Sequence, residues 1–319
     1  MNTQEVNEYI KNNTHLSYSE LSDILGISYG AVKKRYYRLK LPKKEVVYMK
    51  PSKEVEKYLK EKGVRLEEVM ELLEAKKPNI EIIERKTKIK YSFGIVSDTH
   101  LADRACALSA LTTFYKLCSK RGIKDIVHAG DIMTGINVYP GQINDLVCFG
   151  FDDHLKYAVE HYPKIKGIKT YFISGNHDES YKKGFGIDFG KHLNLKRNDL
   201  IYLGMYDATI TLNGVVIGLH HGGGGNSYAL SYKLQKYIEK LGSGQKPQIY
   251  ILGHYHGSFY MFYRNVHCLL PGCWQKPNDF SVRHGLPNQL GGWIINLEIA
   301  DDDKNSIINF KSEFIPFYE

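Results

Sequence analysis

Five apolar stretches of this sequence each end on residues that bind metals. Each stretch is expected to be a buried strand of about 4–8 residues that ends in a turn. In open α/β sheets, ligands bind beyond the carboxyl ends of the strands. The Asp, Asn and His side chains at these ends therefore indicate one polar cluster with the character of a metal-dependent hydrolase site. The five stretches span Phe93–His100, Asp125–Asp131, Thr170–Asp178, Val215–Gly222 and Ile249–His256.

The chemistry that suits such a cluster is phosphoryl transfer. Two divalent cations about 3.5–4 Å apart can hold both the attacking and the leaving oxygen of a displacement at phosphorus. Cations this close need a carboxylate that spans both, and Asp131, which follows Gly130 in a tight turn, is the candidate. We expect two divalent metal ions, with manganese in first place and iron, zinc or nickel as alternatives.

The ordered set Asp-x-His, Gly-Asp, Gly-Asn-His-Asp, His-Gly and Gly-His-x-His resembles the calcineurin-like metallophosphoesterase family. The resemblance covers nearly all of the chain after Tyr91. It implies an α/β fold, a four-layer αββα sandwich with mixed sheets. It also implies two metal sites that share Asp131, one completed by Asp98, His100 and His256, and the other by Asn176, His254 and the histidine of the His-Gly element.

Two histidines compete for that last position. The family pattern is an apolar strand followed by His-Gly, which favours His221, and His220 remains the alternative ligand. Alternation along a strand points the two side chains in opposite directions.

The expected nucleophile is the water or hydroxide between the two metals, with its pKa lowered by both ions. His177 directly follows a ligand position, so we expect it to protonate the leaving oxygen or stabilise its charge. Asp178 is the candidate for orienting His177. Arg283, in a loop rich in turn residues, is a candidate contact for a substrate phosphate.

The N-terminal part has a different character. Helices are expected over Thr3–Asn12, Ser17–Gly26 and Gly30–Leu39, with a Ser17–Glu20 capping box and Ser28 as the cap of the third helix. Two short helices joined by a turn with Gly resemble the helix-turn-helix of DNA-binding proteins. The candidate nucleic-acid-binding residues are Lys33, Lys34, Arg35 and Arg38. A small three-helix domain that binds another partner is the alternative.

Charge supports a division into three zones. Residues 1–90 contain 20 Lys and Arg against 14 Asp and Glu, whereas the remaining 229 residues contain 23 against 21. We expect a small all-α helix-turn-helix domain at 1–44, a charged helical connector at 45–90 and the phosphoesterase domain at 91–319. In the last of these, the short apolar alternations of Leu200–Leu212 and Gly292–Ile299 predict extra antiparallel strands. No apolar run is long enough to span a membrane. The polar N-terminus and five cysteines without a disulfide pattern predict a cytoplasmic protein, although a Cys268–Cys273 bridge stays open.

The substrate is narrowed by two features. The segment after Asp131 reads Ile-Met-Thr-Gly and lacks the Asp-Arg pair that protein phosphatases of the family place there. A basic helical module tethered to a phosphodiesterase raises the local concentration of nucleic acid. The leading hypothesis is therefore a nuclease or phosphodiesterase that acts on DNA or RNA. The alternatives are an esterase for a nucleotide or another small phosphoester, and a DNA-binding regulator with a metal-bound sensor domain.

Overall fold

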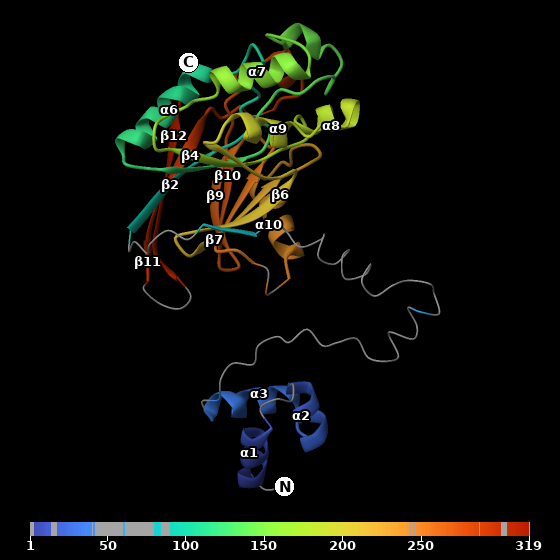
Figure 1. The fold of residues 1–319 in the computed structure, drawn as a ribbon, viewed down its shortest axis with the longest axis vertical. Coiled ribbons are helices and arrows are strands. Elements are labelled where there is room, and N and C mark those ends of the chain that lie inside the picture. Colours follow the sequence, from blue (N-terminus) through green and yellow to red (C-terminus); the bar gives the residue numbers. More distant parts are fainter. Residues whose placement is uncertain are drawn as a thin grey trace. The chain divides into compact units, whose positions relative to one another are not determined.

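The structure is a computed structural model that describes residues 3–13, 18–39, 41, 60, 80–83, 90–242, 244, 246–286, 288–300 and 305–318. The chain divides into two units, Met1–Ala75 and Lys76–Glu319 (Figure 1). The domain boundaries expected at 44 and 90 stay predictions, because the expected connector at 45–90 lies almost entirely outside the described residues.

The first unit contains three short helices, α1 (Thr3–Asn12), α2 (Tyr18–Leu25) and α3 (Tyr29–Arg38). Their positions agree with the predicted helices to within one residue at each described end. The predicted cap is confirmed, since the Ser28 hydroxyl accepts a hydrogen bond from the Ala31 N–H at 3.3 Å. The predicted Ser17 capping box lies outside the described residues. One apolar core joins the three helices, and it contains Val6, Ile10, Leu21, Val32 and Tyr36.

The second unit contains two six-stranded sheets. In spatial order the first sheet consists of β1 (Ile80–Ile83), β6 (Asp207–Leu212), β7 (Val215–His221), β8 (Ile249–Gly253), β10 (Val266–Pro271) and β9 (Ser258–Tyr263). The second sheet consists of β12 (Ile307–Pro316), β11 (Gly291–Ile299), β2 (Lys90–Val96), β3 (Asp125–Ala129), β4 (Lys169–Ile173) and β5 (Leu200–Gly204).

All five predicted strands with polar ends are present, as β2, β3, β4, β7 and β8. In the second sheet β2, β3 and β4 are parallel neighbours, and in the first sheet β7 and β8 are parallel neighbours. Parallel neighbours bring their carboxyl ends to the same edge of a sheet. The loops that follow the five strands therefore lie at two sheet edges, and the residues expected to bind metals lie in those loops.

One strand prediction is confirmed for one strand and wrong for the other. The stretch Leu200–Leu212 is predicted to add antiparallel strands; β6 is antiparallel to β7 in the first sheet, but β5 runs parallel to β4 in the second. The alternation of apolar residues reports which side chains are buried, and it does not report the partner strand. The prediction for Gly292–Ile299 is confirmed, because β11 is antiparallel to both β2 and β12.

The sheets pack face to face and helices cover their outer faces, so the predicted four-layer αββα sandwich is confirmed. The core between the sheets includes Phe93, Val127, Ile217 and Ile251. In neighbouring positions such as Ile126 and Phe172, the side chains of the same strands point outward into a second core under the helices. Strands buried on both faces explain why the sequence reads as continuous apolar runs.

The outer helices are short and lie on opposite sides of the sandwich. Figure 1 shows α6 and α7 above the sheet that contains β2 and β4, and α10 beside β6 and β7. The helices over the second sheet are α6 (Leu108–Lys120), α7 (Phe151–His161), α8 (Glu179–Phe185) and α9 (Phe189–Lys196). Over the first sheet, Leu234 and Ile238 of α10 (Leu230–Lys240) pack against Tyr250 and Leu252 of β8.

Two sequence-based expectations are settled by simple observations. All five cysteines are free thiols, so Cys268 and Cys273 form no bridge. Among the residues that the structure describes, no helix has both the length and the apolar character that a membrane crossing requires.

Candidate metal centre

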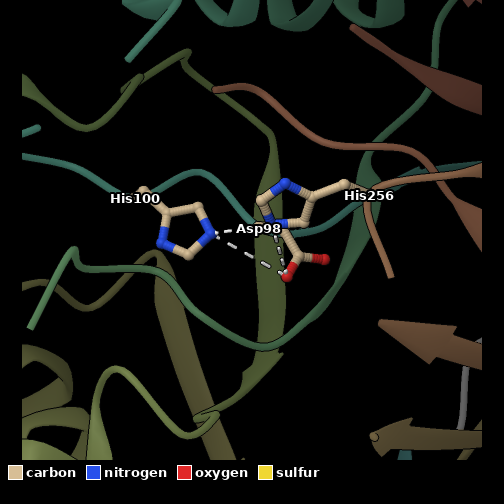
Figure 2. A group of neighbouring side chains, drawn as sticks. All are labelled: Asp98, His100 and His256. Carbon is tan, nitrogen blue, oxygen red and sulfur yellow. Dashed lines mark hydrogen bonds and ion pairs between the residues drawn. The ribbon is translucent and has the colours of Figure 1, made fainter. Parts of the chain in front are cut away.

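The loops after β2 and β8 bring together Asp98, His100 and His256, which we call the Asp98 half of the centre. Figure 2 shows the imidazole rings of His100 and His256 next to each other, with the Asp98 carboxylate beside both. The Nε2 atoms of His100 and His256 lie 3.0 Å apart, and they lie 4.0 and 3.6 Å from Oδ1 of Asp98. Two nitrogen donors and one oxygen donor therefore converge on one point, which is the donor set of a divalent cation site.

The loops after β3, β4, β7 and β8 supply the second group, which we call the Asp131 half: Asp131, Asn176, His221 and His254. Nε2 of His221 lies 3.1 Å from Oδ2 of Asp131 and 3.1 Å from Oδ1 of Asn176. A donor nitrogen of His254 lies within 4.8 Å of donor atoms of Asp131 and His221.

The two halves are adjacent. Ligand atoms of His100, Asp131 and His177 also lie within 4.8 Å of one another, so Asp131 belongs to groups on both sides. The backbone N–H of His254 donates to both carboxylate oxygens of Asp98, at 3.2 and 3.1 Å. The structure thus gathers all seven residues predicted as ligands, with Asp131 at the junction where a bridging carboxylate is expected.

The backbone at the ligands is strained. Asp98, His100, Asp131, His254 and His256 all have positive φ, from 43° to 90°, a region that residues other than glycine adopt rarely. Such conformations cost about 1–3 kcal/mol each and are concentrated at functional sites. At Gly130, where φ is 98°, a side chain would collide with the imidazole of His221. The close approach of the loops therefore requires glycine at that position.

Charge within the centre is mutually stabilised. Burial raises the pKa of both carboxyls, but the hydrogen bond with His256 at Asp98 and the charge of His221 at Asp131 outweigh burial and hold each pKa below its usual range. Burial lowers the pKa of His221, and the Asp131 carboxylate reverses that effect and raises it to about 9. The carboxylates are therefore ionised near neutral pH, and an imidazolium balances part of their charge.

The hydrogen bonds of His221 test whether a cation fits. Its Nδ1 lies 2.8 Å from the Ala129 carbonyl oxygen and must donate to it. In the neutral ring, Nε2 is then a lone pair aimed at two oxygens, those of Asp131 and Asn176. A proton or a metal ion between these three atoms relieves the repulsion, and ligation needs the neutral imidazole. The residues of the Asp131 half thus fit a bound cation, which would replace the proton.

His177 lies beside the metal ligands, with its ring centroid 4.4 Å from that of His100. Its Nδ1 donates to the Thr134 carbonyl oxygen at 2.6 Å, and its Nε2 lies 4.0 Å from Oδ2 of Asp131. The Thr134 oxygen also accepts from the Gln142 side-chain amide at 2.7 Å. The imidazole is therefore fixed through Nδ1 and directs Nε2 toward the centre.

The expected role of Asp178 needs correction. Its carboxylate does not orient His177; it accepts the backbone N–H groups of Ile132, Met133 and Gly175 at 2.9–3.1 Å. Asp178 begins α8, so its side chain points back under the loops and not along the same direction as His177. The residue joins the Asp131 loop to the Asn176 loop. No signal in the sequence points to the actual partner of His177, because every residue type has a main-chain carbonyl.

The histidine pair after β7 is separated as alternation requires. His221 is buried in the centre, whereas the ring of His220 lies on the other face of the sheet, 4.6 Å from the ring of Tyr237. Burial lowers the pKa of His220 to about 4. The structure therefore brings His221, and not His220, to the other predicted ligands.

His128 connects the two halves of the centre through hydrogen bonds. Its Nδ1 accepts the Gly130 N–H at 3.2 Å, and its Nε2 lies 3.1 Å from Oγ1 of Thr99, which donates to the Ile132 carbonyl oxygen. Burial lowers the pKa of His128 to about 4. The neutral ring thus holds the Asp98 loop against the Asp131 loop.

A cavity of about 390 Å³ opens over the centre, and we call it cavity A. Five of the seven predicted ligands and His177 form its floor. Its walls are Val138, Tyr139, Gly224, Gly225, Asn226, Tyr255, Gln275, Asn278, Ser281, His284 and Leu286. Arg283 is exposed and is not among the lining residues, so the structure does not bring it to the centre. Most of these wall residues had no signal in the sequence, since they come from loops without a motif.

A family model described as the calcineurin-like phosphoesterase superfamily domain matches residues 92–285. This range contains every candidate ligand. The chain belongs to the calcineurin-like phosphoesterase superfamily. The family resemblance and the fold that it implied are thereby confirmed.

The chain is similar to part of several curated relatives. The chain is 25% identical to the DNA polymerase II small subunit of Methanothermobacter thermautotrophicus over 260 residues, which are 67% of this chain and 53% of that protein. It is 28% identical to the same subunit of Archaeoglobus fulgidus over 196 residues, 51% of this chain and 40% of that protein. The chain thus spans about half the length of these relatives. A solved archaeal phosphodiesterase is 16% identical, with a TM-score of 0.39 over 70% of this chain and 99% of that one.

Proposed function

We propose that this protein is a phosphoester hydrolase that uses two divalent metal ions, with manganese first among the candidates, and that its substrates are nucleic acids. The observation that carries the proposal is the gathering of seven candidate ligands from five strand ends into two adjacent groups, with Asp131 at their junction. Membership of the superfamily agrees with phosphoester chemistry.

The residues can be assigned roles around a bound phosphodiester. When bound, the two cations supply an activated water nucleophile and offset the charge of the phosphate. Asp98, His100 and His256 would hold one cation, and Asn176, His221 and His254 the other, with Asp131 shared. The described residues in the wall of cavity A include no Lys or Arg, so among them the imidazoles and amides at the centre would supply most of the contacts to the phosphate.

His177 is suited to serve the leaving group. Its Nδ1 donates to the Thr134 carbonyl, so in the imidazolium form only the Nε2 proton is free to move into the cavity. That proton would pass to the leaving oxygen as its bond to phosphorus breaks. The Thr134 carbonyl keeps the ring in place during the transfer, and Gln142 holds the carbonyl.

Two features support nucleic acid as the substrate class. The curated relatives carry the name DNA polymerase II small subunit, and this name associates those proteins with DNA. The exposed face of α3 is formed by Lys33, Lys34, Tyr37 and Arg38, whereas Arg35 is only half-exposed. Three cations on one helix face can neutralise phosphates, and an exposed tyrosine can stack on a base.

A test of the catalytic proposal needs the full chain, Mn²⁺ and four substrates: single-stranded DNA, RNA, bis(p-nitrophenyl) phosphate and p-nitrophenyl phosphate. We expect cleavage of a polynucleotide and of the diester, with little turnover of the monoester, and loss of both activities in Asp131→Asn. Turnover of a nucleotide without any cleavage of polynucleotides contradicts the assigned substrate class.

A test of the α3 face measures DNA binding in EDTA, where no cleavage takes place. Lys33→Glu with Lys34→Glu should weaken binding and flatten its dependence on salt, because fewer counterions are released. Lys116→Glu, an equally exposed site on α6, is the matched control. Equal binding by both variants contradicts a role for this face.

A second candidate is a phosphodiesterase for a nucleotide or another small phosphoester. The observation in its favour is the size of cavity A, since about 390 Å³ lies in the range of small-molecule sites. Its kinetic mark is a higher kcat/KM for a cyclic or dinucleoside phosphate than for any longer strand.

A further inference from the structure

A second hollow adjoins the metal centre. It has a volume of about 500 Å³, and we call it cavity B. It shares Asn176 and Val138 with cavity A, so the two cavities meet at a predicted metal ligand. The rest of its lining comes from α8 and from the segment that carries Ile136 and Asn137.

The walls of the two cavities differ in chemistry. Cavity A offers amides, imidazoles and the rings of Tyr139 and Tyr255. Cavity B offers one cation and one large aromatic ring, Lys183 and Phe185, with Gly184 between them. The Phe185 side chain is 57% exposed, and the Lys183 side chain is 71% exposed. An exposed aromatic ring and a charged amine are the two kinds of group that contact the bases and phosphates of single strands.

The ion pair of Lys183 is compatible with exchange for a phosphate. Its amine contacts the Glu179 carboxylate, and that carboxylate also accepts a hydrogen bond from the Tyr206 hydroxyl at 2.7 Å. When Lys183 turns toward another anion, Glu179 therefore keeps a partner. Exposed ion pairs within one helix are worth only a few tenths of a kcal/mol, so this exchange costs little.

We propose that cavity B binds a nucleotide of a single strand, next to the phosphodiester that is cleaved and on the opposite side of it from the nucleotide in cavity A. In this arrangement Phe185 stacks on a base and Lys183 binds the neighbouring phosphate, the two contacts by which proteins hold single strands. The inference rests on the proposed function and makes it more specific. The preferred substrate has at least one nucleotide on each side of the cleaved bond, and a mononucleotide fills cavity A alone.

The kinetic test compares two substrates in the presence of Mn²⁺: a tetrathymidylate, which reaches both cavities, and bis(p-nitrophenyl) phosphate, which is too short to do so. The ratio of their kcat/KM values should fall about 5- to 150-fold in Phe185→Ala, since stacking one base is worth roughly 1–3 kcal/mol. Lys183→Ala should lower the same ratio by a smaller factor. Lys182→Ala, on the same helix but outside both cavities, and Leu195→Ala, an exposed apolar residue of α9, should keep the wild-type ratio.

An unchanged ratio in Phe185→Ala overturns the proposal, and so does a ratio that falls equally in the two control variants. The second measurement requires no hydrolysis. A tetranucleotide that carries 5-iodouracil is cross-linked to the wild-type chain in EDTA, and the modified peptide is identified by mass spectrometry. We expect the cross-link at Phe185 and its loss in Phe185→Ala.

This second measurement separates the two proposals. A chain that cleaves no phosphoester but cross-links at Phe185 contradicts the catalytic function and supports cavity B as a nucleotide site. A chain that cleaves polynucleotides but cross-links elsewhere supports the catalytic function and overturns the role of cavity B.

Discussion

The two halves of the metal centre hold their imidazoles in different ways. In the Asp131 half, a ring nitrogen of His221 donates to the Ala129 carbonyl, and one of His254 donates to the Gly224 carbonyl at 2.9 Å. In the Asp98 half, Nδ1 of His100 is buried and has no hydrogen-bond partner among the described residues, while the Cys273 thiol is the neighbour of His256. The fold therefore orients both imidazoles of the Asp131 half, whereas the His100 ring of the Asp98 half would need a bound cation to fix it.

The largest expected effect comes from removing the charge that both halves share. Asp131→Asn leaves His221 facing an amide and takes the bridging anion from the centre. We expect hydrolysis of bis(p-nitrophenyl) phosphate to fall at least about 10³-fold, roughly 4 kcal/mol of transition-state stabilisation. Asp152→Asn, an exposed carboxyl of α7, is the control and should keep full activity. A tenfold loss or less in Asp131→Asn contradicts a shared ligand.

The second effect concerns His128, which holds the Asp98 loop against the Asp131 loop, and it depends on pH. The pKa of His128 is about 4 in the folded protein, against about 6.5 when unfolded. Because the folded value is depressed, the stability that the neutral ring contributes is complete above pH 6.5 and is lost as the pH falls toward 4. The expected loss between pH 7 and pH 4 is about 3 kcal/mol from this residue.

Urea unfolding in EDTA at several pH values measures that loss. His128→Asn keeps an acceptor for the Gly130 N–H but does not titrate, so its free energy of unfolding should fall less steeply between pH 7 and pH 4 than that of the wild type. Identical slopes in the two proteins contradict this role for His128.

A smaller effect is expected in the Asp131 half from a substitution of Asp178. In Asp178→Asn, the side-chain NH2 group faces one of the three backbone N–H groups, that of Ile132, Met133 or Gly175. That N–H group then has no acceptor. A buried donor without an acceptor costs about 1–3 kcal/mol, so the free energy of unfolding should fall by about 2 kcal/mol. The variant should also bind Mn²⁺ more weakly in the Asp131 half, because the carboxylate no longer joins the Asp131 loop to the Asn176 loop. A free energy of unfolding equal to that of the wild type would contradict the role of Asp178 in joining the two loops.

The smallest expected effect tests whether the two halves differ in their affinity for Mn²⁺. Calorimetry with Mn²⁺ should resolve two sites whose affinities differ at least about tenfold, because outer hydrogen bonds to ligands are worth 10–100-fold in affinity. His221→Ala should remove the tighter site and His256→Ala the weaker one. Two equal sites, or the reverse assignment, contradict the proposed difference.

The same titrations have a predictable dependence on pH. The pKa of His221 is about 9, so near pH 7.5 its imidazole must lose a proton before it can ligate a cation. Binding at the tighter site should therefore release a proton and strengthen as the pH rises toward 9. Proton release is read from the dependence of the binding enthalpy on the buffer.

The features of the candidate centre that depend on residue type and spacing can be predicted from the sequence. Apolar runs that stop at Asp98, Asp131, Asn176 and His254 predict both the strands and the edge at which they end. Strand alternation also separates His221 from His220. These signals are local, and each is carried by the side chains themselves.

Other parts depend on contacts that leave no mark on residue identity. The partner of His177 is the carbonyl of Thr134, and every residue has a carbonyl. Asp178 is adjacent to His177 in the chain, but the start of α8 turns it away. The pairing of β5 with β4, and of β6 with β7, is decided by packing between distant segments. The sequence also gives no reason to join Phe185 to the centre, because a cavity is a property of the assembled loops.

The positive φ angles at five ligands have a consequence for how long such a centre persists in evolution. At each of these positions glycine, and in several cases asparagine, relieves the backbone, so the substitution that destroys a ligand is also one that makes the chain easier to fold. Without a penalty for losing the metals, random substitution would erode Asp98, His100, Asp131, His254 and His256 early. We therefore expect relatives that no longer use the metals to carry glycine or asparagine at these positions.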